Sequence, residues 1–421
     1  DIEYVFLTHI GDSLPWLKRN IVNFVVKNVK KMVPAYSLPN AIPFNKALQE
    51  GEGKPFKQPE IKSEDLAFLQ YTGGTTGVSK GGMLTHRNVV ANMEQICACI
   101  AGNLQDGKEI IITALPMYHI FALTVNTLAF MKMGGHGILI TNPRDIPAFI
   151  KDLKKHKFSV ITGVNTLFNA LLNHPDFKQV DFASLRFSVG GAMAIQQAVV
   201  DKWRNVTGTT IIEGYGLTEA SPVVTVNPAN GDERIGTIGM PVPSTDVKIM
   251  DEDGKEITEM EVAGEICAQG PQVFKGYWNR KEESDKVLRD GWLYTGDMAV
   301  WLEDGFLKIV DRKKDMILVS GFNVYPNEVE DVIALHPGVL EVACVGIPDD
   351  RSGETVKIFV VKKDENLTAD QLVEFAKKNL TGYKVPRQVE FRDELPKTNV
   401  GKILRRSLRE EEMAKHKATQ S

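Results

Sequence analysis

The strongest chemical signal in the sequence is the run YTGGTTGVSKG, residues 71–81. It gathers glycines, hydroxyl side chains and one cation, namely Thr72, Gly73, Gly74, Thr75, Thr76, Gly77, Ser79 and Lys80. Glycines let the backbone come close to a ligand, hydroxyls donate hydrogen bonds, and an ammonium offsets negative charge. Such a loop suits the oxygens of a polyphosphate. It lacks the Walker spacing, because Lys80 is followed by Gly81 instead of Ser or Thr, and this disfavours GTPases and motor ATPases.

The same run offers a second interpretation, because GVSKG at 77–81 fits the G-x-S-x-G pattern of serine hydrolases with Ser79 as nucleophile. That motif needs a strand running directly into its first glycine, and here TGGTT intervenes. A pattern with three fixed positions also recurs easily by chance. A serine hydrolase acting through Ser79 is therefore the distant alternative.

Four further runs contain residues suited to a nucleotide site. They are PMYHIFAL (116–123), SVGGA (188–192), EGYGLTEASP (213–222) and YTGD (294–297). The second has Gly190 and Gly191 just after an expected strand, where a flat base or a carbonyl could approach closely. The first has His119 among apolar neighbours, where a histidine is more often a packed core residue than a catalyst.

The third and fourth runs carry the more specific groups. Tyr215 can stack on a purine, and the pair Thr218 and Glu219 suits a hard cation. Asp297 could accept hydrogen bonds from two ribose hydroxyls. Each run alone is weak, since a carboxylate near a phosphate loop is often only a structural cap.

Stacked α/β layers are needed to position these runs. Apolar runs such as 109–115, 158–162 and 210–212 alternate with helical stretches, which predicts an α/β fold with largely parallel strands. We expect an N-terminal domain over 1–310, with a β-rich subdomain at about 223–310, and a small C-terminal α+β domain over 311–421 that begins at Asp311.

Composition excludes several classes of protein. The 421 residues are 43% hydrophobic and 25% charged, as in an ordinary globular protein. The net charge of −4 gives no basic field for nucleic acid. The four cysteines form no CxxC pair, which argues against zinc and redox sites and favours a reducing, cytoplasmic location. A homo-oligomer is among the assemblies that the sequence allows.

The sequence predicts a chain that neither spans a membrane nor is secreted. No run of about 18 uncharged apolar residues occurs, and the first residues lack the cationic start of a signal peptide. The opening DIEYVFLTHIGD has no initiator Met. We therefore expect a fragment that lacks its N-terminal portion, able to bind nucleotide but impaired in turnover.

Residues 16–33 form a basic amphipathic pattern. The segment has five cations and no acid, interleaved with large apolar side chains. One interpretation is peripheral adhesion to the anionic inner face of a membrane. The other is a surface helix that packs its apolar side on the protein body.

The order of the motifs resembles a known pattern. The runs described above, followed by DRKKDMILVSGFNVYPNEVE (311–330) and PKTNVGKILRR (396–406), resemble the ordered motifs of the adenylate-forming superfamily of acyl-CoA synthetases, luciferases and peptide-synthetase adenylation domains. The likeness covers residues from about 60 to 410. Within the superfamily, GVNTLFNALL (163–172) and the segment 18–34 look most like bacterial long-chain fatty acid–CoA ligases.

The resemblance implies a two-step reaction with ATP, Mg²⁺ and CoA. A fatty acid carboxylate attacks ATP to give an acyl-adenylate and pyrophosphate, and the CoA thiol then displaces AMP. By the family's pattern, the 72–80 loop holds the β- and γ-phosphates, Thr218 lies at the α-phosphate, and Glu219 holds Mg²⁺. The adenosine would be bound by Gly190, Gly191, Glu213, Gly214, Tyr215, Gly216, Asp297 and Arg312.

Lys402 is the residue that the resemblance assigns to the adenylation step. An ammonium between the α-phosphate and the carboxylate offsets the repulsion of two anions. The family rotates its C-terminal domain about a hinge acid, here Asp311, so that Ser320, Gly321 and Phe322 replace Lys402 at the site. His119 would place the acid's carboxylate. If the PKTNVGK motif is disregarded, the alternative interpretation of Lys402 is an exposed lysine in a basic tail.

Two questions stay open from the sequence. Val164, Leu167, Phe168 and Leu171 either line an acyl channel or belong to the core. Relatives that use another acid, or a carrier protein as acceptor, share adenylate formation, but the absence of an inserted segment before the hinge favours CoA as acceptor. The acyl chain length and the CoA nucleotide pocket are not determined by these motifs.

Overall fold

The computed structural model describes residues 2–72, 79–349 and 351–420. The chain divides into two compact units, an N-terminal unit, Asp1–Ile61, and a main unit, Lys62–Ser421. Among the helices of the described residues, none combines the length and apolarity needed to cross a bilayer.

The N-terminal unit has little regular structure. β1 (Phe6–Leu7) pairs in parallel with β2 (Ile42–Pro43). α1 (Trp16–Phe24) continues into a π-helical turn, η1 (Val25–Val29), and α2 is Phe44–Gly51. The helix expected over 16–33 therefore ends at Val29, and Lys31 has a positive φ of 49° that ends the helical path.

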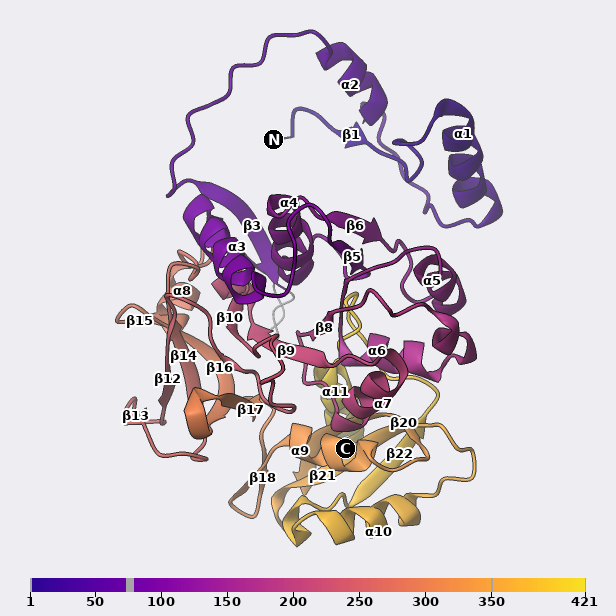
Figure 1. Cartoon of the computed structure of the whole chain (residues 1–421). Coiled ribbons are helices and arrows are strands. Elements are labelled where there is room, and N and C mark those ends of the chain that lie inside the picture. The colour runs from indigo at the N-terminus through magenta and orange to yellow at the C-terminus, as the bar shows by residue number, and fades with distance from the viewer. Residues whose placement is uncertain (1, 73–78, 350, 421) are drawn as a thin grey trace. The chain divides into compact units, whose positions relative to one another are not determined.

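The main unit is built on a seven-stranded sheet with strand order β11-β10-β9-β8-β7-β5-β6 (Figure 1). The strands from β9 to β6 are parallel, and β10 and β11 are antiparallel additions. Their bounds are β5 Ile110–Thr113, β6 His136–Leu139, β7 Val160–Gly163, β8 Phe187–Gly190, β9 Ile211–Gly216, β10 Val223–Val226 and β11 Met240–Pro241. Parallel strands joined by helices confirm the predicted α/β class.

Helices cover this sheet. They are α3 His86–Ile100, the π-helix η2 Ala122–Ala129, α4 Phe130–Lys132, α5 Ile146–Leu153, α6 Asn165–Asn173, the 3₁₀ turn η3 Pro175–Gln179 and α7 Gln197–Thr207. α6 and α7 lie side by side in Figure 1, and their Phe168 and Trp203 rings meet edge to face at 4.8 Å. Both rings are fully buried, and they anchor the largest apolar core.

A hairpin precedes α3. β3 (Leu66–Thr72) pairs antiparallel with β4 (Lys80–Thr85). Thr85 caps α3, because its hydroxyl accepts a hydrogen bond from the backbone N–H of Asn88 at 3.1 Å. The Asn88 amide in turn donates to the carbonyls of Pro271 and Val273, each at 2.8 Å. This contact holds a distant part of the chain beside β4.

A six-stranded antiparallel sheet follows in the chain. It comprises β12 Asp246–Met250, β13 Glu256–Ile257, β14 Gly264–Gln269, β15 Leu288–Arg289, β16 Trp292–Trp301 and β17 Leu307–Arg312. The short helix α8 (Lys281–Val287) lies between β14 and β15 in the chain. β17 runs through Asp311, the predicted domain boundary.

The C-terminal residues form a separate five-stranded sheet with three helices. The strands are β18 Ile317–Val319, β19 Phe322–Val324, β20 Val339–Asp349, β21 Gly353–Lys362 and β22 Gln388–Arg392. The helices are α9 Pro326–Ala334, α10 Ala369–Asn379 and α11 Arg405–Gln420. The buried ammonium of Lys357 pairs with Glu390 at 2.8 Å and with Glu412 at 2.7 Å, which ties α11 to the sheet. The domain boundary at Asp311 stays a prediction.

α6 presents a row of polar side chains to these C-terminal residues. The Thr166 hydroxyl donates to the Gly401 carbonyl at 2.9 Å, and the Asn169 amide donates to the Leu340 carbonyl at 2.9 Å. Lys363 donates to the Asn173 carbonyl oxygen at 2.8 Å. Three hydrogen bonds therefore join α6 to the C-terminal residues, two donated by the helix and one accepted by it.

Candidate active site

A cavity of about 870 Å³ opens in the main unit at the carboxyl ends of β8 and β9. In open parallel sheets this edge is where ligands bind. Most of the predicted site residues line it, namely Thr72, Lys80, His119, Gly190, Gly191, Glu213, Gly214, Tyr215, Gly216, Thr218, Glu219, Asp297, Asp311, Arg312 and Lys402. Residues more than 300 positions apart in the chain thus share one cavity, while their individual roles remain predictions.

Some predicted residues lie elsewhere. Gly73, Gly74, Thr75, Thr76 and Gly77 fall outside the described residues. Ser79 is described, is exposed, and is not part of the cavity lining. It directly precedes strand β4, whereas a hydrolase nucleophile sits on a turn between a strand and a helix. This geometry argues against the hydrolase alternative.

The Ser320, Gly321 and Phe322 turn also lies outside the cavity lining. Ser320 and Gly321 both have positive φ, 51° and 84°, and form the turn between β18 and β19. The Phe322 ring stacks on Tyr383 with 4.8 Å between centroids. The predicted replacement of Lys402 by this turn requires a second arrangement of the C-terminal residues and stays a prediction.

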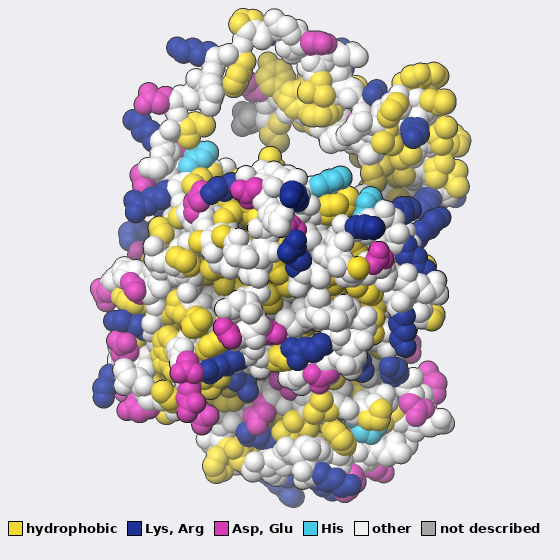
Figure 2. All heavy atoms as spheres, viewed as in Figure 1, with side chains coloured by type: hydrophobic (Ala, Val, Ile, Leu, Met, Phe, Trp, Pro, Cys, Tyr) yellow, Lys and Arg dark blue, Asp and Glu magenta, His cyan; other side chains and the backbone are white. Residues whose placement is uncertain are grey.

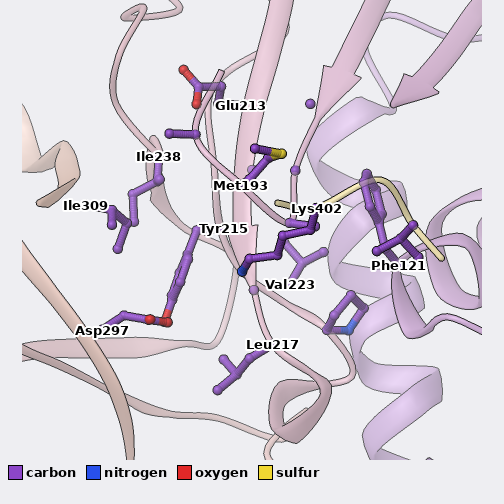
Figure 3. Close-up of a pocket in the computed structure, with 18 of the residues that line it drawn as sticks. Phe121, Met193, Glu213, Tyr215, Leu217, Val223, Ile238, Asp297, Ile309 and Lys402 are labelled. Atoms are coloured by element: carbon purple, nitrogen blue, oxygen red, sulfur yellow. The ribbon is translucent and has the colours of Figure 1, made fainter. Parts of the chain in front are cut away.

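Tyr215, Asp297 and Arg312 form one connected group at the wall of the cavity. The Tyr215 hydroxyl donates to Asp297 Oδ2 at 2.8 Å, and Arg312 Nε lies 3.2 Å from Asp297 Oδ1. Asp297 and Arg312 face each other across strands β16 and β17. Burial, followed by the Asp297 charge, raises the pKa of Tyr215 well above its usual value, so this hydroxyl stays protonated. The ring is fixed in place, with its face along the cavity (Figure 3).

Two glycines of the predicted adenine site are required by packing. A Cβ at Gly190 would lie 2.6 Å from Ile195 Cγ1, and a Cβ at Gly216 would lie 2.1 Å from the Pro222 carbonyl oxygen. From the sequence, the lack of a side chain at Gly190 is expected to let a base approach closely. The structure adds a second reason, since strand β8 must also come close to Ile195.

The Glu213 side chain connects two loops at the cavity. Its carboxylate accepts hydrogen bonds from the backbone N–H groups of Ile195, at 3.1 Å, and Gly236, at 3.3 Å. Burial raises its pKa to about 7, against the two hydrogen bonds that lower it. In this arrangement Glu213 positions the loops that would flank a base.

Lys402 is presented by a short hairpin in the C-terminal segment. The Thr398 N–H donates to the Lys402 carbonyl at 2.8 Å, and the Lys402 N–H donates to the Thr398 hydroxyl at 3.1 Å. Gly401, with φ 84°, makes the turn. The side chain extends into the cavity that Tyr215 and Asp297 line (Figure 3). Desolvation, followed by the Arg312 charge, lowers the pKa of Lys402 to about 7.

Glu219 is held by a residue that sequence analysis missed. Thr218 and Glu219 begin a 3₁₀ turn, and the Tyr277 hydroxyl donates to Glu219 Oε1 at 2.5 Å. Among the described residues, no three metal-ligating side chains gather. Mg²⁺ often binds through one or two carboxylates together with substrate phosphates. Glu219, with Thr218 beside it, therefore fits a Mg²⁺ that arrives with a nucleotide.

Lys80 also has partners that were missed. Its ammonium forms an ion pair with Glu283 of α8 and lies 5.2 Å from the centroid of the Tyr277 ring. Tyr277 and Glu283 lie within the run GYWNRKEE (276–283), which has no clustered glycines or hydroxyl side chains. The pairing of Gly82 with Tyr277 brings them to the site, and no local sequence signal could have located them.

His119 lies where the chain enters the π-helix η2. Its Nδ1 accepts a hydrogen bond from the Phe121 N–H at 3.3 Å. Burial, followed by the charge of Lys402, lowers the pKa of His119, so the imidazole is neutral near pH 7.

A second part of the cavity lining is apolar. It comes from α3, η2, α4 and the strands β7 and β8, and includes Ile96, Cys99, Ile100, Val125, Phe130, Val160, Phe187 and Val189. We call it the apolar arm. The four residues considered for an acyl channel, at the start of and within α6, are buried in the core and do not line the cavity; they are Val164, Leu167, Phe168 and Leu171. The structure therefore supports core packing for these residues and not the lining of an acyl channel.

Asp311 is the centre of a charged network. Its carboxylate accepts from the backbone N–H groups of Arg312 and Asn327, each at 2.7 Å, and pairs with Arg405 at 3.1 Å. Arg405 also pairs with Glu330 at 2.6 Å. Burial raises the pKa of Asp311 to about 6, although Arg405 opposes the shift. The predicted hinge acid is thus bonded to its neighbour Arg312, to the start of α9 and to Arg405, which follows Lys402 by three residues.

The chain matches two family models and several known proteins. The family model described as AMP-binding enzyme matches residues 7–278, and that of the AMP-binding enzyme C-terminal domain matches residues 328–402. The chain is 59% identical to the long-chain-fatty-acid–CoA ligase of Salmonella typhimurium over 98% of this chain and 74% of that protein. The corresponding ligase of Bacillus subtilis is 42% identical over 99% of this chain and 74% of its own length.

Solved structures agree with these matches. ATP-bound MatB from Rhodopseudomonas palustris has a TM-score of 0.80 at 31% identity, covering 88% of this chain and 74% of that one. The anthranilate CoA ligase AuaEII in complex with anthranoyl-AMP has a TM-score of 0.82 at 26% identity, covering 92% of this chain and 76% of that one. The chain therefore belongs to the AMP-binding enzyme family, the adenylate-forming superfamily that its ordered motifs predict.

Proposed function

We propose that this chain is an ATP-dependent acid–thiol ligase that converts a long-chain fatty acid to acyl-CoA through an acyl-adenylate. The observation that carries the proposal is the shared cavity, in which Lys402, the Tyr215, Asp297 and Arg312 group, and the apolar arm meet. Its curated relatives at 59% and 42% identity bear the name of the same activity.

In the first step a carboxylate oxygen of the acid attacks the α-phosphorus of ATP. A bond forms between that oxygen and phosphorus, the bond to the bridging oxygen breaks, and pyrophosphate leaves. The two reactants are anions, so a cation between them lowers the barrier. Lys402 is the group we assign to this place, because its ammonium lies in the cavity and its low pKa leaves it ready to gain a proton as anions bind.

In the second step the CoA sulfur bonds to the acyl carbon and gives up its proton to solvent, while the bond from that carbon to the AMP phosphate oxygen breaks and AMP leaves with the bonding electrons. Asp297 and Arg312 would hold the ribose through both steps, and Glu219 would hold Mg²⁺, which neutralises phosphate charge when it is bound. His119, which is neutral and lies three residues before η2, would orient the acid's carboxylate without adding a competing cation.

The acyl chain would occupy the apolar arm. Burying a methylene group contributes about 0.8 kcal/mol, so an apolar channel favours acids with longer chains. The lining there comes from aliphatic and aromatic side chains, with Cys99 among them. This supports a long-chain acid over the small polar acids that other adenylate-forming enzymes accept.

Acid-dependent release of pyrophosphate tests the proposal. We expect release with long-chain acids and none without an acid. Lys402→Ala should lower the adenylation rate by about 10²–10³-fold, as removal of one charge-stabilising group does, while thioesterification of preformed acyl-adenylate persists. Lys397→Ala is the matched control, since Lys397 pairs with Glu341 and lies outside the cavity lining. Equal losses in both half-reactions would contradict the role of Lys402.

We further propose that the segment 16–33 adheres to anionic membranes. Trp16, Leu17, Ile21, Phe24 and Val29 are all more than half exposed. In the space-filling view hydrophobic side chains gather over α1 (Figure 2). Exposed apolar groups flanked by cations and free of acids are the features of an interfacial helix, where each cation adds about 1 kcal/mol at an anionic surface.

Vesicle flotation separates this proposal from a helix that merely packs on protein. Binding to phosphatidylglycerol vesicles and weak binding to phosphatidylcholine vesicles is expected. The variant Lys27→Glu/Lys30→Glu/Lys31→Glu should lose the preference. If that variant floated with the vesicles as well as the unsubstituted protein does, the segment 16–33 would not be the membrane-binding element.

A further inference from the structure

We propose that Glu283 is an internal counter-ion that pairs with Lys80 when no nucleotide is bound and thereby weakens the enzyme's affinity for the polyphosphate of ATP. The inference rests on the proposed function, since it assigns a residue that tunes the first substrate's binding. Glu283 would act through Lys80 and would not touch the nucleotide itself.

The ion pair joins the cavity to a residue outside it. Lys80 is the first residue of β4 and lines the cavity, whereas Glu283 lies on α8 and does not. The side chains are 21% and 33% exposed, so the pair is neither fully buried nor free in solvent. An incoming anion can therefore reach the Lys80 ammonium, but it must compete with a carboxylate already in place.

The pair is held by backbone structure on both sides. Gly82 forms a β-bridge with Tyr277, and the Trp278 N–H donates to the Gly81 carbonyl at 2.8 Å. The Ser284 hydroxyl then accepts from the Tyr277 N–H at 2.8 Å, which fixes the start of α8. Glu283 is consequently presented to Lys80 by the fold, and little conformational freedom is lost when the pair forms.

A second cation lets Glu283 give up Lys80 when an anion arrives. Glu283 Oε1 also lies 2.8 Å from Lys286 Nζ, one turn further along α8. Side-chain hydrogen bonds from Lys286 and then Lys80 lower the pKa of Glu283 to about 2, so it is ionised at neutral pH. When Lys80 moves to a phosphate, the carboxylate keeps its pair with Lys286. The exchange replaces one ion pair of Lys80 by another without leaving an isolated charge.

Two outcomes distinguish a counter-ion from a residue that simply aims Lys80 at the ligand. A counter-ion competes with phosphate, so its removal should tighten ATP binding. A residue that aims Lys80 should, when removed, weaken ATP binding. In both cases the effect must be confined to nucleotides whose distal phosphates can reach Lys80.

The experiment measures binding of ATP and of AMP, each with Mg²⁺, by isothermal titration calorimetry in the absence of fatty acid. For Glu283→Gln we expect a dissociation constant for ATP that is about 2- to 5-fold lower, as for loss of one partly exposed competing charge, and an unchanged constant for AMP. Glu282→Gln removes the same charge from the neighbouring position of α8, and it should leave both constants unchanged. Combining Glu283→Gln with Lys80→Met should abolish the gain.

The proposal is overturned by weaker or unchanged ATP binding in Glu283→Gln, by an equal effect on AMP, or by an equal effect of Glu282→Gln. It is also overturned if the gain persists with Lys80→Met. Failure of the proposed function has a different signature, because the unsubstituted protein would then bind neither nucleotide.

Discussion

Tyr277 links two groups that the sequence assigned separately to ATP. Its hydroxyl donates to the Glu219 carboxylate at 2.5 Å, and its ring lies 5.2 Å from the Lys80 ammonium. A hydrogen bond to a charged acceptor contributes about 1.5–3 kcal/mol. The hydroxyl therefore fixes which Glu219 oxygen is free for a cation.

For Tyr277→Phe we expect the Mg²⁺ concentration that gives half-maximal pyrophosphate release to rise about 10-fold, as the loss of such a bond implies. The affinity for AMP without Mg²⁺ should not change. Tyr294→Phe, on β16 and outside the cavity lining, is the control. An equal rise of the half-maximal Mg²⁺ concentration in both variants would show that the effect comes from a general change in packing.

The low pKa of Lys402 predicts the pH dependence of the free enzyme. Its folded value is about 7, below the ordinary 10.5, so between these values the folded state binds fewer protons than the unfolded state and stability rises with pH. Adenylation needs the charged form, so kcat/KM for ATP should fall as pH rises through about 7. In Lys402→Arg, which stays charged, this fall should vanish from ATP–pyrophosphate exchange measured between pH 6 and 9. An identical profile in both proteins would contradict the assignment.

At the residue scale, the sequence predicted the site residues that lie together in short motifs. Tyr215, Asp297 and Lys402 come from motifs whose residue types reveal a nucleotide site, and all three line the cavity. Tyr277 and Glu283 could not be found in this way, because their importance comes from a strand pairing with Gly82, which no local pattern encodes.

Helix α3 sets the shape of the apolar arm. Ile96, Cys99 and Ile100 have the i, i+3, i+4 spacing of one helix face, and all three line the cavity. A larger side chain at Cys99 would shorten or block the arm. Overpacking of such a site costs about 1–3 kcal/mol.

We therefore expect Cys99→Phe to raise the KM for long acids about 10-fold, which corresponds to about 1.4 kcal/mol, and to shift the preference toward shorter acids. The KM for ATP should stay unchanged. Val90→Phe, on the exposed face of α3, is the matched control. If Cys99→Phe left the chain-length profile unaltered, the acyl chain would have to lie elsewhere.

At the element scale, periodicity predicted which faces are buried but not what they are buried against. The apolar face of α6 had two interpretations, a channel lining or core, and it packs on Trp203 in the core. The arm is lined instead by α3 and η2, and a π-helix such as η2 has no periodicity that sequence reading recognises.

The contact between α6 and the C-terminal residues helps to hold Lys402 in the cavity. Thr166 and Asn169 contribute two hydrogen bonds across this contact, each with a net value of about 0.5–1.5 kcal/mol. Both bonds exist in the arrangement that delivers Lys402. They should favour that arrangement over any other that the second half-reaction uses.

The variant Thr166→Ala/Asn169→Ala should slow adenylation about 5- to 50-fold, as expected when about 1–2.5 kcal/mol is removed from a two-state equilibrium. Thioesterification of preformed acyl-adenylate should not slow. Gln197→Ala on α7, whose partner is Asp201, provides the control. A parallel loss in both half-reactions would indicate general destabilisation.

At the scale of the molecule the order of motifs predicted the family and the α/β fold, and both are confirmed. The contact between α6 and the C-terminal segment was not predicted. Asn169 is an ordinary surface residue type and its acceptor is the backbone carbonyl of Leu340, so the contact arises only when α6 and the C-terminal sheet meet.

The weakness of the α6 contact bears on the fate of the intermediate. Three hydrogen bonds of this kind amount to about 1.5–4.5 kcal/mol, far below the roughly 16 kcal/mol barrier of a reaction at 10 s⁻¹. The segment carrying Lys402 would then lift and return many times while an acyl-adenylate waits for thiol. Each opening admits water to a reactive mixed anhydride. In the absence of CoA, the enzyme should therefore leak slowly by hydrolysis, consuming ATP to give AMP and the unchanged acid.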